Sequence, residues 1–391
     1  MKRLCTAGLL LALLCPGRLL AEEPEGLQGS RIPPAPPAAA IDAALQKGVA
    51  FLVSHQNEDG SWGSFESARP YEVLLGTTAS FSAFGDATTA LCVTALMAPA
   101  RKDKDAARAL EKGAAYLFRR APVKRATAQV LYSLWTQIYV LEAASAVLQE
   151  PRLKEFHPGA RKAAARQLKV LQEIQANEGG FAYYDFSFAG QHPTGAQSCS
   201  FTTAAALIAL HHAKDAGIDV PAKLTEDAVR SLARLRFPNG AYAYSMPARL
   251  YPHAMANRLK GSLGRSQVCN LALWKYGKDV GREDLKRGLN QLFRHHHFIE
   301  MGKGRPYPHE SWYQTAGYYF FFGHYYAAHV ARELPKEEGS VYLGALASTM
   351  CRLQDPAGSW WDFPLYGYHK AYGTAFALLT LQLAGTKGDG Q

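Results

Sequence analysis

Cysteine, methionine and tryptophan are all scarce in this chain, with six of each among 391 residues. Cys5 and Cys15 fall in an apolar segment at the N-terminus, and the other four cysteines are far apart. This spacing excludes a small disulfide framework, so we expect buried thiols with at most one bridge. The net charge is +10, but no basic run interleaves with aromatic residues, which argues against a nucleic-acid partner.

Long apolar runs are also absent beyond the start of the chain. Met1 to Arg3 is basic, residues 4–14 are apolar apart from Thr6, and Ala21 precedes two glutamates. This order is typical of a secretory signal peptide, and the run is too short to span a bilayer. We therefore expect a signal peptide over residues 1–21 and a secreted or periplasmic protein. A retained anchor and a lipoprotein cut before Cys15 are the alternatives, and the basic charge is compatible with a peripheral contact with a membrane surface.

The remainder of the chain divides simply. Residues 22–40 are rich in proline and alanine, which favours an extended linker. The folded body is expected over residues 41–384, followed by a flexible tail over residues 385–391. Such a body is long for one ordinary domain, but no second linker divides it, and repeat architectures reach this length without splitting.

One pattern occurs four times: an amphipathic helix, a polar turn with glycine, and then an aromatic residue. Before the first turn, Ile41, Leu45 and Val49 recur every four residues, as on one face of a helix. Glycine supplies the left-handed backbone that ends a helix. The aromatic residue should cover the helix end, and an interior glutamine should bond the backbone of the neighbouring turn. The four segments are residues 51–62, 171–181, 235–242 and 353–360.

Six further segments are apolar on nearly all sides and rich in small residues. Helices of this kind are buried, whereas the charged helices between them belong outside. Six inner and six outer helices that close on themselves predict an all-α fold, an (α/α)6 toroid of six helical hairpins. The inner segments are residues 88–93, 134–139, 202–207, 266–271, 314–319 and 373–378.

Two stretches resemble a known group of toroids. The turn Gln-Asn-Glu-Asp-Gly-Ser-Trp at residues 56–62 resembles the Gln-Trp repeat of squalene and terpene cyclases. The series Thr-Ala-Phe-Ala-Leu-Leu at residues 374–379 is similar to both the cyclases and the prenyltransferase β-subunits. The resemblance implies their toroid over residues 41–384 but not their activity, because related toroids also serve as binding and complement-like domains.

The residues on which the chemistry of these families depends are missing. The cyclases carry Asp-x-Asp-Asp-Thr-Ala, but the nearest frame here has one acid, Asp86, which serves either as a lone acid or as a helix cap. Prenyltransferases bind zinc through Asp-x-Cys and a histidine. The matching positions are Gln314, Ala316 and Gly373, none of which is a good zinc ligand. The thioester motif Gly-Cys-Gly-Glu-Gln is absent too.

The histidines do not replace this chemistry. Neighbours on a helix point about 100° apart, so His295, His296 and His297 cannot all ligate one ion. A displaced zinc site at His369 and Cys269 is the alternative to our expectation of no metal and no cofactor.

Polar and aromatic residues stand at the inner-helix mouths, which the toroid gathers at one end. We expect the ring cavity to bind an apolar small molecule or a peptide, without cyclase or prenyltransferase activity. The aromatic run at residues 318–326 is either a cavity lining or plain core. The ligand-binding candidates are Asp86, Arg265, Trp312, Tyr368 and Tyr372. The catalytic candidates are Glu310, Asp362, His369, His309 and Tyr313.

Two enzyme classes stay open beside binding. The first is an (α/α)6 enzyme acting on a glycan. A lyase would use Tyr313 or His309 as base and Arg265 to neutralise a sugar acid, whereas a hydrolase would use Glu310 and Asp362 as its carboxylate pair. The second is a divergent class II terpene cyclase with Asp86 as its acid.

Overall fold

The computed structural model describes residues 32–69, 78–119, 129–131, 133–182, 184–186 and 198–385. Arg31–Gln391 form one compact unit. The expected signal peptide, the first part of the linker and nearly all of the tail lie outside the described residues. Within the described part of the chain, no helix has the length and apolarity needed to cross a membrane.

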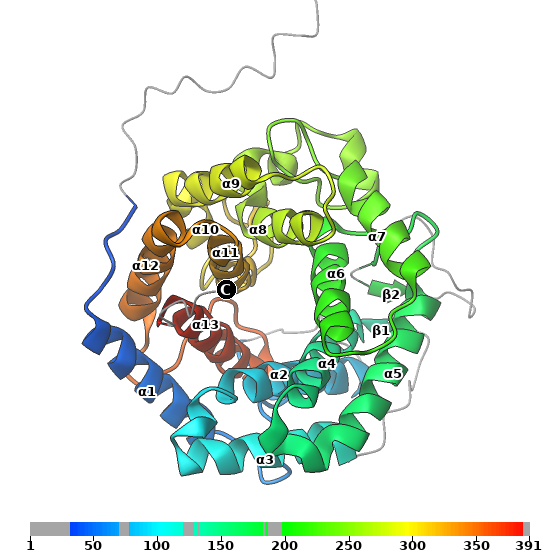
Figure 1. Cartoon of the computed structure of the whole chain (residues 1–391). Helices are drawn as coiled ribbons and strands as arrows, with labels where there is room; N and C mark the ends of the chain where they lie inside the picture. Colours follow the sequence, from blue (N-terminus) through cyan, green and yellow to red (C-terminus); the bar gives the residue numbers. More distant parts are fainter. Residues whose placement is uncertain are drawn as a thin grey trace, which may run out of the picture. The chain divides into compact units, whose positions relative to one another are not determined.

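Two concentric rings of helices make up this unit (Figure 1). Each inner helix packs on the next, and α13 packs on α2 to close the ring, which confirms the predicted toroid. The inner helices are α2 (Thr78–Leu96), α4 (Ser133–Leu148), α6 (Ser200–Asp215), α8 (Leu259–Lys275), α11 (Tyr319–Arg332) and α13 (His369–Gly385). The outer helices are α1 (Ala38–Ser54), α3 (Lys104–Arg119), α5 (His157–Ile174), α7 (Ala222–Arg234), α9 (Arg282–Arg294) and α12 (Lys336–Leu353).

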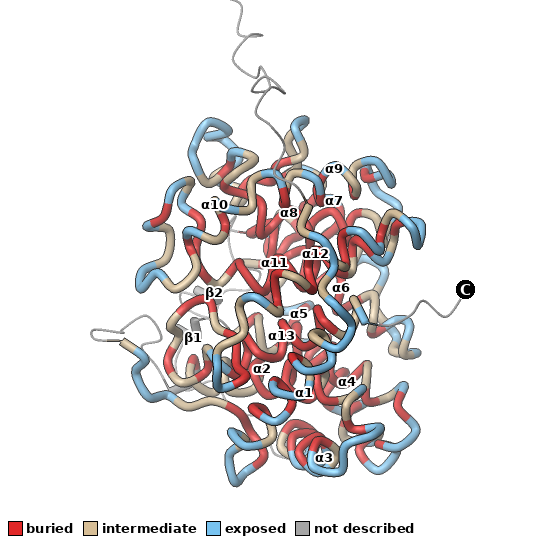
Figure 2. Tube along the Cα trace, turned by 90° about the vertical axis from the view of Figure 1, so that its left-hand side faces the viewer, coloured by how far each residue is buried: buried red, intermediate tan, exposed pale blue. Residues whose placement is uncertain are grey.

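Burial follows the two rings. The inner helices are buried along most of their length, whereas the outer helices bury one face and expose the other (Figure 2). Short elements connect them, and the described residues include α10 (His296–Glu300) and six 3-10 helices. The 3-10 helices are η2 (Pro99–Arg101), η3 (Pro151–Phe156), η5 (Pro247–Leu250), η6 (Met255–Asn257), η7 (Trp312–Gln314) and η8 (Tyr366–Tyr368). Strands β1 (Gln129–Leu131) and β2 (Tyr184–Phe186) pair antiparallel.

Some boundaries differ from those expected. Helix α1 begins at Ala38 rather than at residue 41, because alanines 38–40 favour a helix and Pro37 fits just before its first turn. Helix α11 begins at Tyr319, so most of the expected inner segment 314–319 precedes it. Its backbone explains this: Tyr313 and Gln314 have φ angles of 61° and 55°, which no α-helix contains.

The repeated turns behave as their sequence predicts. Their glycines, Gly60, Gly179, Gly240 and Gly358, have φ angles of 91°, 93°, 84° and 89°. The aromatic residue after each turn is fully buried in all four repeats: Trp62, Phe181, Tyr242 and Trp360. In three repeats its backbone N–H donates to a threonine of the next inner helix. These bonds run from Trp62 to Thr89 (3.1 Å), from Phe181 to Thr203 (2.9 Å) and from Trp360 to Thr374 (3.1 Å).

The glutamine of the turn joins one hairpin to the next. The Gln56 amide donates to the carbonyl of Gly60 in its own turn (3.0 Å) and to that of Ala109 on α3 (2.9 Å). Gln175 reaches α7 in the same way. Gln354 donates to Ala44 on α1 at 3.0 Å, across 310 residues of sequence. The predicted glutamine hydrogen bond is therefore present, but its distant partner lies on the next outer helix. The bond of Gln354, in the last repeat, joins the end of the ring to its first helix.

Candidate functional site

An apolar cavity of about 110 Å³ lies near the N-terminal ends of the inner helices. We call it the aromatic cavity. None of the described residues that line it carries a charge, and most of them are aromatic. The aromatic lining residues are Phe84, Trp135, Tyr139, Phe201, Tyr318, Tyr319, Phe322, Phe363, Tyr372 and Phe376.

Edge-to-face contacts between aromatic side chains stabilise the wall of the aromatic cavity. Phe201 meets Tyr319 edge to face at a centroid distance of 5.2 Å, and Trp135 meets Phe322 at 6.0 Å. These rings come from α4, α6 and α11, which the closed toroid turns toward the same central space. Edge-to-face pairs fix ring orientation, so the cavity is largely preformed.

Tyr372 is the one predicted site residue that lines this cavity. Its hydroxyl donates to Asp362 Oδ1 at 2.8 Å, and the N–H of Phe321 donates to Asp362 Oδ2 at 3.0 Å. Burial raises the pKa of Asp362 to about 6, although both of these hydrogen bonds lower it. Asp362 therefore caps the first turn of α11 and orients the Tyr372 hydroxyl on the cavity wall.

His309 stands beside the mouth of the aromatic cavity. Its Nδ1 lies 2.7 Å from the carbonyl oxygen of Gln314, and its Nε2 lies 3.3 Å from the hydroxyl of Tyr318. An imidazole that donates through Nδ1 and accepts through Nε2 satisfies both contacts. Burial lowers the pKa of His309, which favours this neutral form.

The two candidate carboxylates of a hydrolase lie in unlike places. Glu310 is exposed, and its nearest hydrogen bond is from the N–H of Tyr307 at 3.4 Å. Asp362 is fully buried and already accepts the two hydrogen bonds described above. A glycoside hydrolase requires two carboxyl groups that flank one open cleft. Here one acid is exposed, and the other is buried with a hydrogen bond to each of its oxygens.

Arg265 is occupied by the fold rather than by an open site. Its guanidinium donates to the carbonyls of Gly261 (3.0 Å), Tyr242 (3.2 Å) and Ala256 (2.6 Å), and its side chain is 1% exposed. Tyr313 is half-buried at the surface, with Lys260 over its ring. The structure does not bring these two residues together as the base and the cation of a lyase.

The remaining candidates are scattered around the mouth. Trp312 is 62% exposed. The Tyr368 hydroxyl donates to the carbonyl of Phe81 at 3.1 Å, and His369 Nδ1 lies 2.5 Å from the carbonyl oxygen of Tyr366. Asp86 lies within α2, where it accepts a hydrogen bond from the Tyr116 hydroxyl at 3.1 Å. The helix-cap interpretation of Asp86 is therefore wrong, because α2 starts eight residues earlier, at Thr78.

The described residues contain no group of three or more histidine, cysteine or acidic side chains that could hold a metal ion. His296 Nε2 lies 2.8 Å from His324 Nε2, and its Nδ1 lies 3.3 Å from Glu300. Both ring nitrogens of His296 are therefore engaged by neighbouring side chains of the fold. The four described cysteines form no disulfide with one another. Burial raises the pKa of the Cys269 thiol, which makes it a poor metal ligand and nucleophile.

A second cavity, of about 610 Å³, lies at the C-terminal ends of the inner helices and was not predicted. We call it the polar cavity. Glu142, His212 and His329 face it. Glu142 is the single charged residue in the apolar sequence of α4, and such a residue is rarely buried without a partner. That was the signal in the sequence that would have revealed this cavity.

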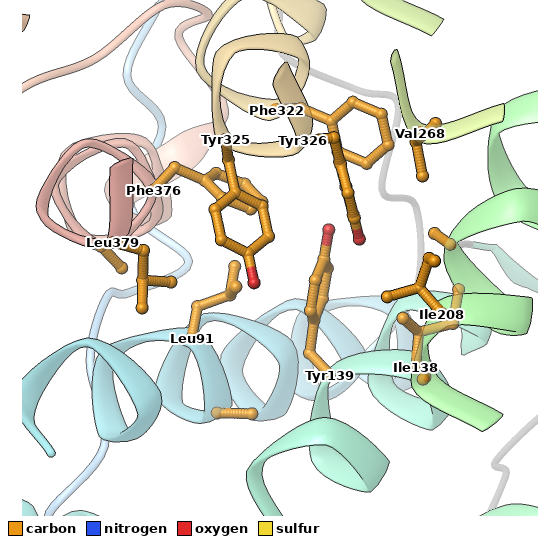
Figure 3. Close-up of a cluster of buried hydrophobic side chains, with 14 of the residues drawn as sticks. Leu91, Ile138, Tyr139, Ile208, Val268, Phe322, Tyr325, Tyr326, Phe376 and Leu379 are labelled. Atoms are coloured by element: carbon orange, nitrogen blue, oxygen red, sulfur yellow. The ribbon is translucent and has the colours of Figure 1, made fainter. Parts of the chain in front are cut away.

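The two cavities share no described lining residue, and a plug of buried side chains lies between their walls; Figure 3 shows this plug. The hydroxyls of Tyr139 and Tyr326 point toward one another in its centre, and Tyr325 lies beside them. Tyr139 faces the aromatic cavity, and Tyr325 faces the polar cavity. The toroid therefore offers two independent cavities rather than one continuous channel.

No protein-family model matches the chain, and no curated protein matches its sequence. Solved structures do match. A D-mannose isomerase aligns over 89% of this chain and 99% of its own, at 13% identity and a TM-score of 0.56. Cellobiose 2-epimerase from Bacillus thermoamylovorans B4167 aligns over 88% and 98%, at 9% identity and 0.56. A type II terpene cyclase from Scytonema aligns over 90% and 99%, at 12% identity and 0.36. The isomerase and the epimerase show the fold alone, an (α/α)6 toroid.

Proposed function

We propose that this protein binds an apolar small molecule in the aromatic cavity. The observation that carries the proposal is the wall itself, in which aromatic rings surround a preformed space and no described side chain is charged. Binding sites for small ligands are mostly apolar, with a few polar groups that fix orientation. Here the Tyr372 hydroxyl, held by Asp362, would orient one polar atom of the ligand.

A substitution that fills the aromatic cavity with a larger side chain tests this proposal. Ala87 lines it, and a phenyl ring at this position would occupy much of its roughly 110 Å³. We expect Ala87→Phe to weaken binding of the small apolar fluorophore indole, whose size suits a cavity of this volume, by about tenfold or more, a loss of about 1.4 kcal/mol. Fluorescence titration measures this affinity, and native mass spectrometry of the purified protein shows whether a natural ligand is retained.

The matched control is Ala146→Phe, which places the same ring in the polar cavity. It should leave fluorophore affinity unchanged. Both variants should melt near the wild-type temperature. Equal affinity of wild type and Ala87→Phe would disprove binding in the aromatic cavity.

The surface around this end of the ring suggests how an apolar ligand arrives. Among the described residues, eight large apolar side chains are exposed to solvent. Seven of them lie in the connections that lead into α2, α8 and α11. They are Phe65, Leu250, Tyr251, Met255, Met301, Tyr307 and Trp312. The connection over residues 247–258 contains basic but no acidic residues. Exposed apolar side chains with basic neighbours suit the interface of an anionic membrane, so we propose peripheral membrane contact there.

Removing this apolar rim should release the protein from vesicles. We expect the double substitution Tyr251→Ser and Trp312→Ser to reduce co-sedimentation with phosphatidylglycerol-containing vesicles by about tenfold. Val341→Ser is the matched control, because Val341 is 53% exposed but lies on the outer helix α12. Equal loss in the control, or no loss in the double variant, would count against the membrane contact.

A further inference from the structure

The polar cavity is built around a cluster of four side chains: Glu142 on α4, His212 on α6, and Tyr325 and His329 on α11. His212 Nδ1 lies 3.6 Å from Glu142 Oε1, beyond hydrogen-bonding distance. The His212 and His329 ring centroids are 6.4 Å apart, and those of Tyr325 and His329 are 4.7 Å apart. The cluster therefore forms one continuous patch on the cavity wall.

This cluster keeps its hydrogen-bonding capacity open toward the cavity. The Glu142 side chain lines the cavity and is 7% exposed, whereas its Oε1 is buried on the side of His212 and accepts no hydrogen bond among the described residues. A buried carboxylate oxygen without a partner is costly for the fold. Neither His329 nor the Tyr325 hydroxyl has a hydrogen bond within the described part of the chain. A carboxylate acceptor, two imidazoles and a phenol thus face one space, which points to a ligand with several donors and acceptors.

The charges around the cavity cancel, which weighs against a cationic ligand. Glu150 is paired with Arg101 (3.3 Å) and Arg152 (2.9 Å). Asp215 lies 3.4 Å from His211, but burial lowers the pKa of His211 and favours its neutral form, so the second arginine beside Glu150 balances the Asp215 charge instead. Burial lowers the pKa of His212, but the adjacent Glu142 outweighs burial and raises it, so the two form a near-neutral pair. Little net charge then remains to attract an ion.

The remaining wall is partly aliphatic. Met97, Leu379 and Leu383 line the cavity beside the polar cluster. A saccharide presents hydroxyl groups, which both donate and accept, and apolar C–H faces, which pack on such a wall. A volume of about 610 Å³ is within the usual range for a small-molecule site.

We propose that the polar cavity is a second ligand site, which binds a small saccharide through Glu142, His212, Tyr325 and His329. This site does not depend on the aromatic cavity, because the plug separates the two. Glu142 would accept hydrogen bonds from sugar hydroxyls, and the imidazole of His329 would donate or accept another. The aliphatic residues opposite would contact the face of the sugar ring.

Isothermal titration calorimetry with cellobiose, D-glucose and spermidine tests the proposal on the full chain. We expect wild type to bind a saccharide at millimolar concentration or below, and not spermidine. Glu142→Gln, which keeps the shape but removes the charge, should weaken that binding by about tenfold. His329→Phe should weaken it by a similar factor.

Ala87→Phe separates the two proposals, because it fills the aromatic cavity and should leave saccharide affinity unchanged. If His329→Phe does not fold, the isosteric Glu142→Gln decides alone. Three results would overturn the assignment: no saccharide binding by wild type, wild-type saccharide affinity in Glu142→Gln, or binding of spermidine in place of the saccharides. The fluorophore titration tests the aromatic cavity alone, so its result does not depend on the outcome for the saccharides.

Discussion

Trp360→Ala is expected to lower the free energy of unfolding by about 3–5 kcal/mol, the cost of removing a fully buried aromatic side chain. Trp360 lies in the last repeated turn, is 0% exposed, and donates its indole N–H to the carbonyl of Met350 at 2.8 Å. Its ring also fills the space beside α1, where Gly48 lacks a side chain. The residue therefore joins the last hairpin to the first. Guanidinium chloride denaturation measures the loss.

Two companion variants make this test specific. Trp312→Ala removes the same side chain from a site that is 62% exposed, so we expect a change within about 0.5 kcal/mol. Gly48→Ala would place a Cβ 2.7 Å from the Trp360 ring and 2.8 Å from the Leu378 side chain, and it should destabilise the wild type. In the Trp360→Ala background the same substitution should cost less, because the ring is gone. Additive losses would show that Trp360 does not seal α13 against α1.

Repetition is what made the fold predictable from the sequence. Each turn glycine required a left-handed backbone, and each following aromatic residue required a buried place, so one physical solution had to recur around the chain. The Thr-Ala series of the inner helices has a reason that the sequence did not reveal. Thr89 and Thr374 accept the backbone N–H of the turn aromatic, which ties their two turns to inner helices.

The candidate site was less predictable from the sequence. It depends on which side chains bond to the protein's own backbone and which line a cavity, and the sequence does not distinguish the two. Arg265 and Asp362 look reactive in the sequence, but their polar atoms serve the ends of α8 and α11. Of the ten predicted residues only Tyr372 lines the aromatic cavity. The polar cavity combines residues from separate hairpins, and apart from Glu142 in the apolar helix α4 no local sequence feature indicates it.

Acid should destabilise this protein through two imidazoles, the fully buried His324 and the partly buried His329. Burial, with the nearby charges of His212, Lys275 and Arg332, lowers the pKa of His329 to about 3 from an ordinary value of 6.5. Burial lowers the pKa of His324 to about 3 as well. Below pH 6.5 the unfolded chain binds protons that the folded chain does not, so stability falls as the pH falls. Between pH 7 and pH 5 each histidine should cost about 2 kcal/mol.

The difference between variants isolates this effect. Asp362 opposes it, because a carboxyl whose folded pKa is raised to about 6 gains stability on acidification. That contribution is common to wild type and His329→Phe and cancels between them. We therefore expect His329→Phe to lose about 2 kcal/mol less than wild type between pH 7 and pH 5. The exposed His297, replaced by glutamine, is the control and should follow wild type. If His329→Phe shows the full wild-type loss, then His329 takes up its proton in the folded protein, from the side of the polar cavity.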